Sequence, residues 1–261
     1  MFKSRFLTTA ALFFLFANLV SAQEKRQLIR VNTYQIKTAE KAELFDSMME
    51  SAVQALSDYG VKPIGVFKLA DPDKEATYPH LRVTIAPYDD MDQIVNQLQA
   101  FNGNSSFWQD SEAYLTLEAD EAAFDRVDSM LLYAFSGMPQ LAVPGDGKAQ
   151  NRLFELRTYE SYSEYTALIK VNMFNDGEIE LFEKVGLPAV FYGSAIAGGN
   201  LPQLTYMLVH DDEQAQKAGW TNFIRSPEWA ALQKKDPYAG KKLVSKIIKT
   251  MLVATDYSQI R

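Results

Sequence analysis

Two short segments of this chain carry the residue types best suited to anion binding or proton transfer. In each segment three polar side chains stand at alternate positions, which in a β-strand point to one face of the sheet. The two polar rows are Arg30, Asn32 and Tyr34 in the first segment, and Glu155, Arg157 and Tyr159 in the second. Arginine can hold a carboxylate or an enolate-like oxygen by charge-assisted hydrogen bonds, and Tyr159 or Glu155 could transfer a proton.

No established catalytic motif accompanies these rows. The sequence contains no His-Glu-x-x-His, no Gly-x-Ser-x-Gly, no phosphate-binding Gly-x-x-x-x-Gly-Lys and no dinucleotide-binding Gly-x-Gly-x-x-Gly. It has no Cys and only two His, His80 and His210, so no metal site is predicted. The sequence therefore leaves open whether the protein is an enzyme, and it assigns no catalytic residue.

The histidines and the paired aspartates have simpler structural interpretations. His210 ends a β-rich segment and could act as a general base or an axial haem ligand, but an ordinary surface or cap-adjacent histidine is the favoured interpretation. Asp89-Asp90 and Asp211-Asp212 resemble paired carboxylates for a metal or for acid–base work. Because each pair directly precedes a predicted helix, N-capping is the favoured interpretation.

The chain reads as a tandem duplication. Leu-Ile-Arg-Val-Asn-Thr-Tyr at 28–34 aligns with Leu-Phe-Glu-Leu-Arg-Thr-Tyr at 153–159, 125 positions later, and Gly60, Asp89-Asp90 and 130–132 have counterparts at similar shifts. Between the copies, 137–150 contains Pro139, Pro144, Gly145 and Gly147, as expected of a linker. We expect one domain over 27–136, the linker over 137–150 and a second domain over 151–257.

Hydrophobic periodicity and turn residues predict the same element order in both copies. In the first copy strands are expected at 28–34, 64–69, 81–86 and 130–135, with helices at 39–59 and from Asp89 or Asp90 to about 98. In the second copy strands are expected near 153–159, 189–192, 204–209 and 250–255, with a helix over 164–185 and another after the N-cap Ser226. The order βαββαβ is that of a ferredoxin-like domain, so we predict an α+β fold with two tandem domains of this kind.

The first strand of each copy has one apolar and one polar face. Ile29, Val31 and Thr33 correspond to Phe154, Leu156 and Thr158 on the apolar face. We expect this face to lie under the helices. The polar rows would then meet either water or the other sheet.

The N-terminus has the form of a signal peptide. Lys3 and Arg5 precede an apolar run from Phe6 to Val20, and Val20-Ser21-Ala22 supplies small residues for cleavage. We expect export to the periplasm or the medium after cleavage near Ala22, with no membrane span remaining. Loss of Lys3 and Arg5 takes the formal charge from −7 to −9, and an acidic surface disfavours nucleic acid and anionic lipid as partners.

From Leu153 to about Leu232 the sequence resembles the NIPSNAP family. The resemblance is carried by the strand 154–159, the helix segment 170–180, the segments 186–192 and 201–208, and a final block that ends in Ser226-Pro227-Glu228-Trp229. The first half looks like a diverged copy. The resemblance implies a dimeric α/β-barrel fold, here formed within one chain, but it implies no settled activity and no cofactor; haem enters only by analogy with other proteins of this fold.

If the two sheets close on each other, the polar rows would face an enclosed space between them. Tyr192, Tyr206 and His210 would be their neighbours. Charged groups there need partners, so the rows form either an internally satisfied polar network or a pocket for a small polar or anionic molecule. The alternative function is a non-catalytic interaction scaffold whose helices present a partner surface. Further oligomerisation is compatible with both hypotheses.

Overall fold

The computed structural model describes residues 25–74, 77–145 and 152–261. The elements of the first half are β1 (Leu28–Gln35), α1 (Ala39–Asp58), β2 (Gly65–Leu69), β3 (Arg82–Tyr88), α2 (Met91–Asn96), α3 (Ser105–Asp110), α4 (Glu112–Leu115) and β4 (Arg126–Ala134). Each strand and the two main helices of this half lie where the sequence predicts them, with ends that differ by a few residues.

The second half contains β5 (Leu153–Glu160), α5 (Glu164–Met173), α6 (Ile179–Lys184), β6 (Ala189–Ala197), β7 (Gln203–His210), α7 (Glu213–Arg225), α8 (Pro227–Leu232) and β8 (Lys246–Ala254). The prediction of one continuous helix over 164–185 is wrong. A π-helical turn, Phe174–Glu178, separates α5 from α6, and within it Gly177 has φ 144°, a backbone conformation that favours glycine.

Side-chain capping fixes the start of several helices as the sequence predicts. The Thr38 side chain accepts a hydrogen bond from the Lys41 amide at the start of α1. Asp90 and Asp212 cap α2 and α7, accepting from the backbone amides of Gln93 and Ala215 at 2.9 and 2.8 Å. The aspartate pairs are therefore explained by helix capping.

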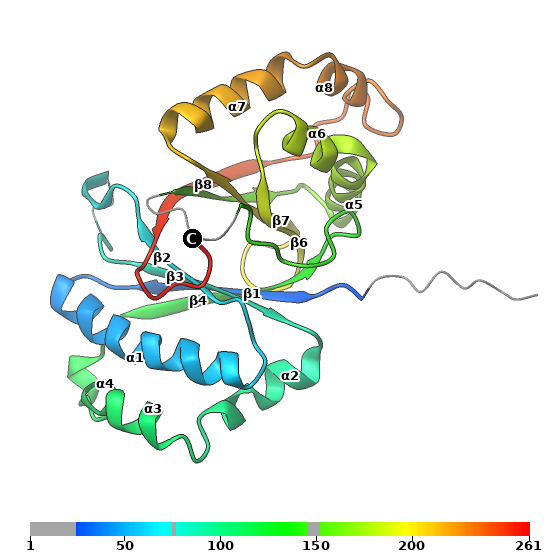
Figure 1. Ribbon diagram of the computed structural model, residues 1–261. Coiled ribbons are helices and arrows are strands. Elements are labelled where there is room, and N and C mark those ends of the chain that lie inside the picture. The colour runs from blue at the N-terminus through cyan, green and yellow to red at the C-terminus, as the bar shows by residue number, and fades with distance from the viewer. Residues whose placement is uncertain (1–24, 75–76, 146–151) are drawn as a thin grey trace, which may run out of the picture.

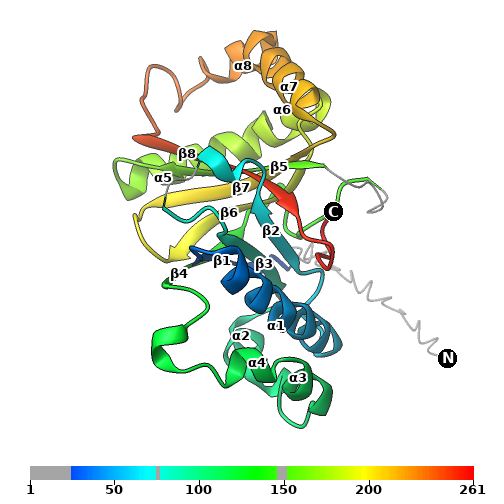
Figure 2. The same ribbon diagram turned by 90° about the vertical axis from the view of Figure 1, so that its left-hand side faces the viewer.

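The strands form one closed antiparallel barrel in the order β1-β3-β2-β8-β5-β7-β6-β4. The first half contributes β4-β1-β3-β2 and the second half β8-β5-β7-β6, so both halves have the same strand order. The pairs β2–β8 and β4–β6 join them. Figures 1 and 2 show α1 to α4 covering one side of the barrel and α5 to α8 covering the opposite side. The predicted α+β barrel fold within one chain is confirmed.

The barrel interior is filled by apolar side chains, and the predicted orientation of the strand faces is wrong. Ile29, Val31, Phe154 and Leu156 belong to one interior cluster, which also includes Phe67, Val83, Leu132, Phe191 and Met207. The polar rows lie instead on the outer faces, beneath the helices. The physical reason is that the interior is enclosed on every side, whereas the layer under the helices opens to water at its edges; the more apolar face therefore turns inward.

Segments outside the regular elements complete the core. Leu141 and Val143, from the predicted linker, pack against the interior cluster. The C-terminal tail returns to the first half: the Gln259 amide donates to the Ile64 carbonyl at 2.9 Å, and Ile260 is fully buried in the interior cluster. Among the described residues, no helix is long and apolar enough to cross a membrane.

Candidate functional site

Glu155 on β5 is the centre of a buried polar network between the second-half sheet and its helices. Its side chain is fully buried, and its carboxylate accepts hydrogen bonds from Trp220 Nε1 at 2.8 Å and Gln216 Nε2 at 2.9 Å. Arg157 lies at 2.6 Å and His210 Nε2 at 3.3 Å. Burial alone would raise the pKa of Glu155, but these hydrogen bonds, with that from His210 the largest, outweigh it and lower the pKa to about 2.

Arg157 is held by this carboxylate and by two aromatic rings. Its guanidinium lies 4.3 Å from the centre of the Trp220 ring and 5.6 Å from that of Tyr159. Burial opposes its charge, but Tyr206, Tyr159 and Glu155 together raise the pKa of Arg157 above its ordinary value. Arg157 Nε is buried without a hydrogen-bond partner. Arg157 therefore forms a structural ion pair with Glu155, and its Nε–H group makes no hydrogen bond.

The predicted tyrosines lie in the same layer as Glu155 and Arg157. The Tyr206 hydroxyl donates to the Tyr159 hydroxyl at 2.7 Å, and the Tyr206 ring stacks on that of Tyr192 at 5.5 Å. These rings pack against Phe174 and Phe182 beneath the helices. Burial raises the pKa of Tyr192 and Tyr206 well above the ordinary value. Six of the nine predicted site residues thus form one cluster.

The three first-half residues do not join this cluster. Arg30 and Tyr34 lie on the outer face of the other sheet, where Tyr34 packs against Phe45 of α1 at 4.6 Å. Arg30 Nε is 3.3 Å from Asn32 Oδ1 and 3.4 Å from Ser129 Oγ. Because the packed barrel lies between the two polar rows, the expectation that they face each other across a shared space is wrong.

A second buried ion pair lies in the same layer, and the sequence analysis did not identify it. Lys170 Nζ on α5 is 2.6 Å from Glu178 Oε2, and the exposed fractions of the two side chains are 6% and 3%. Lys170 Nζ also lies 4.5 Å from the centre of the Phe174 ring and 5.8 Å from that of Tyr159. Burial raises the pKa of Glu178, and the charge of Lys170 opposes that shift.

The π-helical turn brings this ion pair together. Residues eight apart on a straight α-helix are separated by about 12 Å along the axis. The kink at Gly177 turns Glu178 back toward Lys170, and the Asn175 side chain ties the turn to the predicted linker by accepting from the Gly137 amide at 2.7 Å. The available sequence signal was a glycine inside a helical pattern, within the segment 170–180 that carries the family resemblance.

Lys170 also lines an open cavity with a volume of about 500 Å³. Met173 and Trp229 form apolar walls, and Lys241 and Lys242 lie at its edge. Gln233, Tyr238, Gly240, Leu243 and Val244 complete the lining. The cavity, hereafter the Lys170 cavity, therefore combines a buried cation, an aromatic wall and a basic edge.

Comparison with known proteins finds a family similarity in the second half. Residues 154–259 match the NIPSNAP family model. We refer to this matched region, residues 154–259, as the NIPSNAP domain. A search of curated proteins gave no match.

Solved structures with similar folds cover the whole barrel. A putative monooxygenase from Lactobacillus acidophilus NCFM aligns with TM-score 0.56 and 10% identity over 88% of this chain and 94% of its own. A putative monooxygenase from Fusobacterium nucleatum aligns with TM-score 0.54 and 12% identity over 88% of this chain and 93% of its own. An anthrone oxidase-like protein aligns with TM-score 0.51 and 9% identity over 89% of this chain and 93% of its own. At these identities the similarity shows the fold alone.

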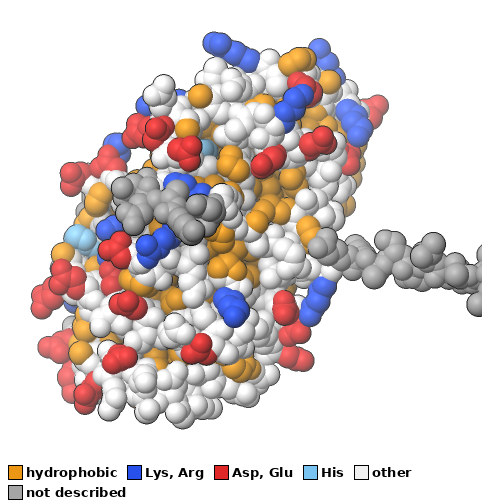
Figure 3. Space-filling model, viewed as in Figure 1, with side chains coloured by type: hydrophobic (Ala, Val, Ile, Leu, Met, Phe, Trp, Pro, Cys, Tyr) orange, Lys and Arg blue, Asp and Glu red, His pale blue; other side chains and the backbone are white. Residues whose placement is uncertain are grey.

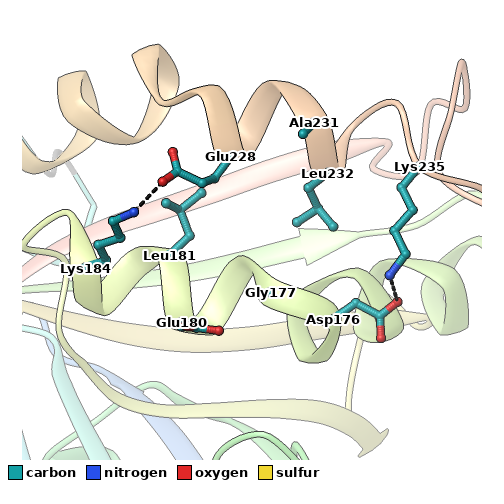
Figure 4. A pocket seen from close by; sticks show the side chains of 9 residues that line it. All are labelled: Asp176, Gly177, Glu180, Leu181, Lys184, Glu228, Ala231, Leu232 and Lys235. Atoms are coloured by element: carbon teal, nitrogen blue, oxygen red, sulfur yellow. Dashed lines mark hydrogen bonds and ion pairs between the residues drawn. The ribbon is translucent and has the colours of Figure 1, made fainter.

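Besides the Lys170 cavity, the NIPSNAP domain has a groove between α6 and α8 with a volume of about 540 Å³. Figure 4 shows an ion pair at each end, Lys184 with Glu228 and Lys235 with Asp176, and Leu181 and Leu232 between them. The side chains of both ion pairs are well exposed, in contrast to the buried Lys170–Glu178 pair. The charges of this groove are therefore solvent-exposed and already paired with each other.

The two histidines lie in different parts of the fold, and only His210 belongs to the Glu155 network. No group of three or more His, Cys, Asp or Glu in the described residues could hold a metal ion. His210 is fully buried with Nε2 directed to Glu155, and its Nδ1 has no hydrogen-bond partner. His80 lies outside the NIPSNAP domain, at the end of the loop before β3. The prediction that no cofactor is required remains a prediction.

Proposed function

We propose that the NIPSNAP domain binds a small amphipathic anion, a carboxylate with an apolar or aromatic body, in the Lys170 cavity. The observation that carries this proposal is the buried Lys170–Glu178 ion pair, of which Lys170 lines the cavity. A buried ion pair adds little stability compared with apolar residues of the same volume, because two charges must be desolvated. Stability of the fold alone therefore does not account for it, and buried charges beside a cavity mark candidate binding sites.

The contacts of Lys170 suggest how a ligand is held. Its ammonium group has three donors, and Glu178 accepts one of them. The remaining contacts are weak acceptors, Met173 Sδ at 3.9 Å and the ring faces of Phe174 and Trp229. A ligand carboxylate is a stronger acceptor than sulfur or an aromatic ring. It would add a charge-assisted hydrogen bond, while Met173 and Trp229 contact its apolar body.

The Glu155 network adjoins this site through Tyr159. Tyr159 lies between the two ion pairs, with its ring near both Arg157 and Lys170. We therefore assign a positioning role to Glu155, Arg157 and the neighbouring tyrosines, in place of direct ligand contact. Arg30, Asn32 and Tyr34 have no part in the proposed site.

Titration calorimetry with octanoate and benzoate tests the proposal. The double variant Lys170→Met/Glu178→Gln removes both charges together, so neither is left buried without its partner. We expect at least about tenfold weaker binding in this variant, since a charge-assisted hydrogen bond is lost. Lys184→Gln, in the neighbouring groove, is the matched control and should bind as the unaltered protein does. Equal affinity in the double variant would contradict the proposal.

The second candidate function is a non-catalytic interaction scaffold. The packed barrel interior favours it over any function that needs an open barrel. Native mass spectrometry of protein purified from its own organism distinguishes the two. A retained small anion supports the binding function, and a retained protein with no small molecule supports the scaffold.

We also propose that the protein is exported and that its two halves arose by duplication. Support for export comes from the basic start, the apolar run and the small residues before Gln23. Support for duplication comes from the repeated sequence segments and the common strand order. N-terminal sequencing of protein from native cells tests export: a chain that starts at Gln23 agrees with it, and an intact Met1 on the cytoplasmic protein contradicts it.

A further inference from the structure

The helices of the first half form an acidic surface with exposed apolar side chains. Residues 83–125 contain nine Asp or Glu and no Lys, Arg or His. On α2 and the turn that follows it, Met91, Val95 and Leu98 have the spacing of one helix face and are 49%, 69% and 69% exposed. Trp108 and Leu115, on α3 and α4, are also exposed. We call this surface the acidic face.

The NIPSNAP domain carries a surface of the opposite charge. Residues 229–250 contain six Lys and one Asp. Beside them Tyr162, Tyr165 and Leu168, at the start of α5, and Ile247 on β8 are each more than half exposed. We call this surface the basic face.

Contacts within the domain bring part of the basic face together. Lys242 Nζ lies 5.3 Å from the centre of the Tyr162 ring. The Ser245 amide donates to the Glu160 carbonyl at 2.8 Å, which places the start of β8 beside the end of β5. Glu160, the last residue of β5, is paired with Lys246. Glu164, the first residue of α5, is a further acidic side chain nearby in the sequence. Lys242 and the exposed Tyr162 ring therefore share one surface, and Lys246 lies at the adjoining end of β8.

We infer that the acidic face of one molecule docks on the basic face of a second copy of this chain. The two faces complement each other in charge, and each exposes apolar side chains that a contact would bury. They lie on opposite sides of the barrel, with α2 to α4 on one side and α5 on the other (Figure 1). In Figure 3 the part of the surface farthest from α7 and α8 shows acidic side chains and no Lys or Arg.

A contact between two different faces is heterologous. Each molecule can use both faces at once, so the contact adds molecules head to tail and forms a ring or a filament, depending on whether the rotation closes. Lys241 and Lys242 border the Lys170 cavity as well as the basic face. A docked copy would therefore cover the cavity edge, although the contact itself does not depend on a ligand.

Sedimentation velocity of the chain beginning at Gln23 tests this inference. We expect concentration-dependent association that weakens as salt rises, because the contact pairs opposite charges. An acidic-face variant, Val95→Ser/Leu98→Ser/Asp110→Asn, and a basic-face variant, Tyr165→Ser/Leu168→Ser/Lys246→Gln, should each associate at least about tenfold more weakly. The surface variant Lys217→Gln/Ile224→Ser, outside both faces, is the control and should associate like the unaltered protein.

Mixing the two face variants gives the decisive result. Each variant keeps one intact face, so the mixture should form a 1:1 complex and nothing larger. No association by the unaltered chain at any concentration would overturn the inference, and so would a mixture that stays monomeric. A monomer whose basic face instead binds phosphatidylglycerol vesicles would overturn it in favour of a lipid partner. None of the substituted positions lines the Lys170 cavity, so octanoate binding by the variants reports separately on the proposed function.

Discussion

The two halves share a strand order but use the outer faces of their sheets differently. In the first half the polar row on β1 forms weak, partly exposed contacts, such as that of Arg30 Nε with Asn32 Oδ1 at 3.3 Å. In the second half the corresponding row on β5 is buried, and the Glu155 carboxylate contacts four donors. The same backbone position therefore carries an open polar row in one half and a buried charge network in the other.

The difference agrees with the proposal that the binding site lies in the second half. Buried charges are maintained against a desolvation cost, whereas partly exposed polar groups are tolerated without one. The half with the Glu155 network and the Lys170–Glu178 pair is also the half that matches the NIPSNAP family, although Arg82 of the first half is buried as well, paired with Asp46. It contains the kinked helix pair and the Lys170 cavity, while α1 of the first half runs unbroken for 20 residues. The first half supplies the rest of the barrel and the acidic face.

Arg157→Ala should show the largest difference between the halves. Truncation leaves the Glu155 charge buried without its main counter-charge, so we expect a loss of about 3–5 kcal/mol in the free energy of unfolding. Asn32→Ala, at the corresponding position of β1, should lose less than about 1 kcal/mol. Denaturant unfolding of both variants gives the comparison. A loss below about 1 kcal/mol for Arg157→Ala would show that the network contributes no more than surface ion pairs do.

Lowering the pH should reduce the free energy of unfolding through Glu155 of the second half. The pKa of Glu155 in the fold is about 2, below its ordinary value of 4.5. A carboxylate with a lowered pKa stabilises the fold above its ordinary pKa, and this stability, on the order of 3 kcal/mol, is lost as pH falls from 4.5 toward 2. Glu178, whose pKa is raised, has the opposite effect: its contribution to the stability of the fold increases as pH falls.

Urea unfolding between pH 6 and pH 3 measures this dependence on acid, and Glu155→Gln isolates the contribution of Glu155. The free energy of unfolding should fall less steeply with acid in the variant than in the unaltered protein. Parallel curves for the two proteins would exclude Glu155 as a source of the acid sensitivity.

Gly177→Ala tests the kink that the first half lacks. An added Cβ would meet no atom within 4 Å, so the expected loss of about 1–2 kcal/mol comes from the backbone conformation alone. Gly199→Ala is the matched control, because its Cβ would also meet nothing and its φ is not in the left-handed region. Thermal unfolding of the two variants should separate them, and equal stability would mean that the turn at Gly177 is not strained.

Helix caps should have the smallest effect and the same effect in both halves. Asp90→Ala and Asp212→Ala each remove a side chain that accepts from a backbone amide, so each should lose about 1 kcal/mol. Denaturant midpoints provide the measurement. A loss several times larger for Asp212 would indicate that its carboxylate has a role beyond capping.

The sequence predicts the elements well because strand alternation, caps and turn residues are local signals. Thr38, Asp90 and Ser226 start helices where expected. Prediction from the sequence fails where the structure depends on packing between distant segments. Both faces of β5 are buried, so alternation alone does not show that Phe154 lies inside the barrel and Glu155 under α7. The Lys170–Glu178 pair depends on a π-helical turn that regular helix periodicity does not reveal.

The central claim is that the ligand site lies under the helices of the NIPSNAP domain and not inside the barrel. A crystal structure of the protein soaked with octanoate tests it most directly. The account predicts the carboxylate within hydrogen-bond distance of Lys170 Nζ, with the alkyl chain against Met173 and Trp229. Ligand density inside the barrel, among Phe67, Phe154 and Phe191, or an empty Lys170 cavity at saturating octanoate, would contradict it.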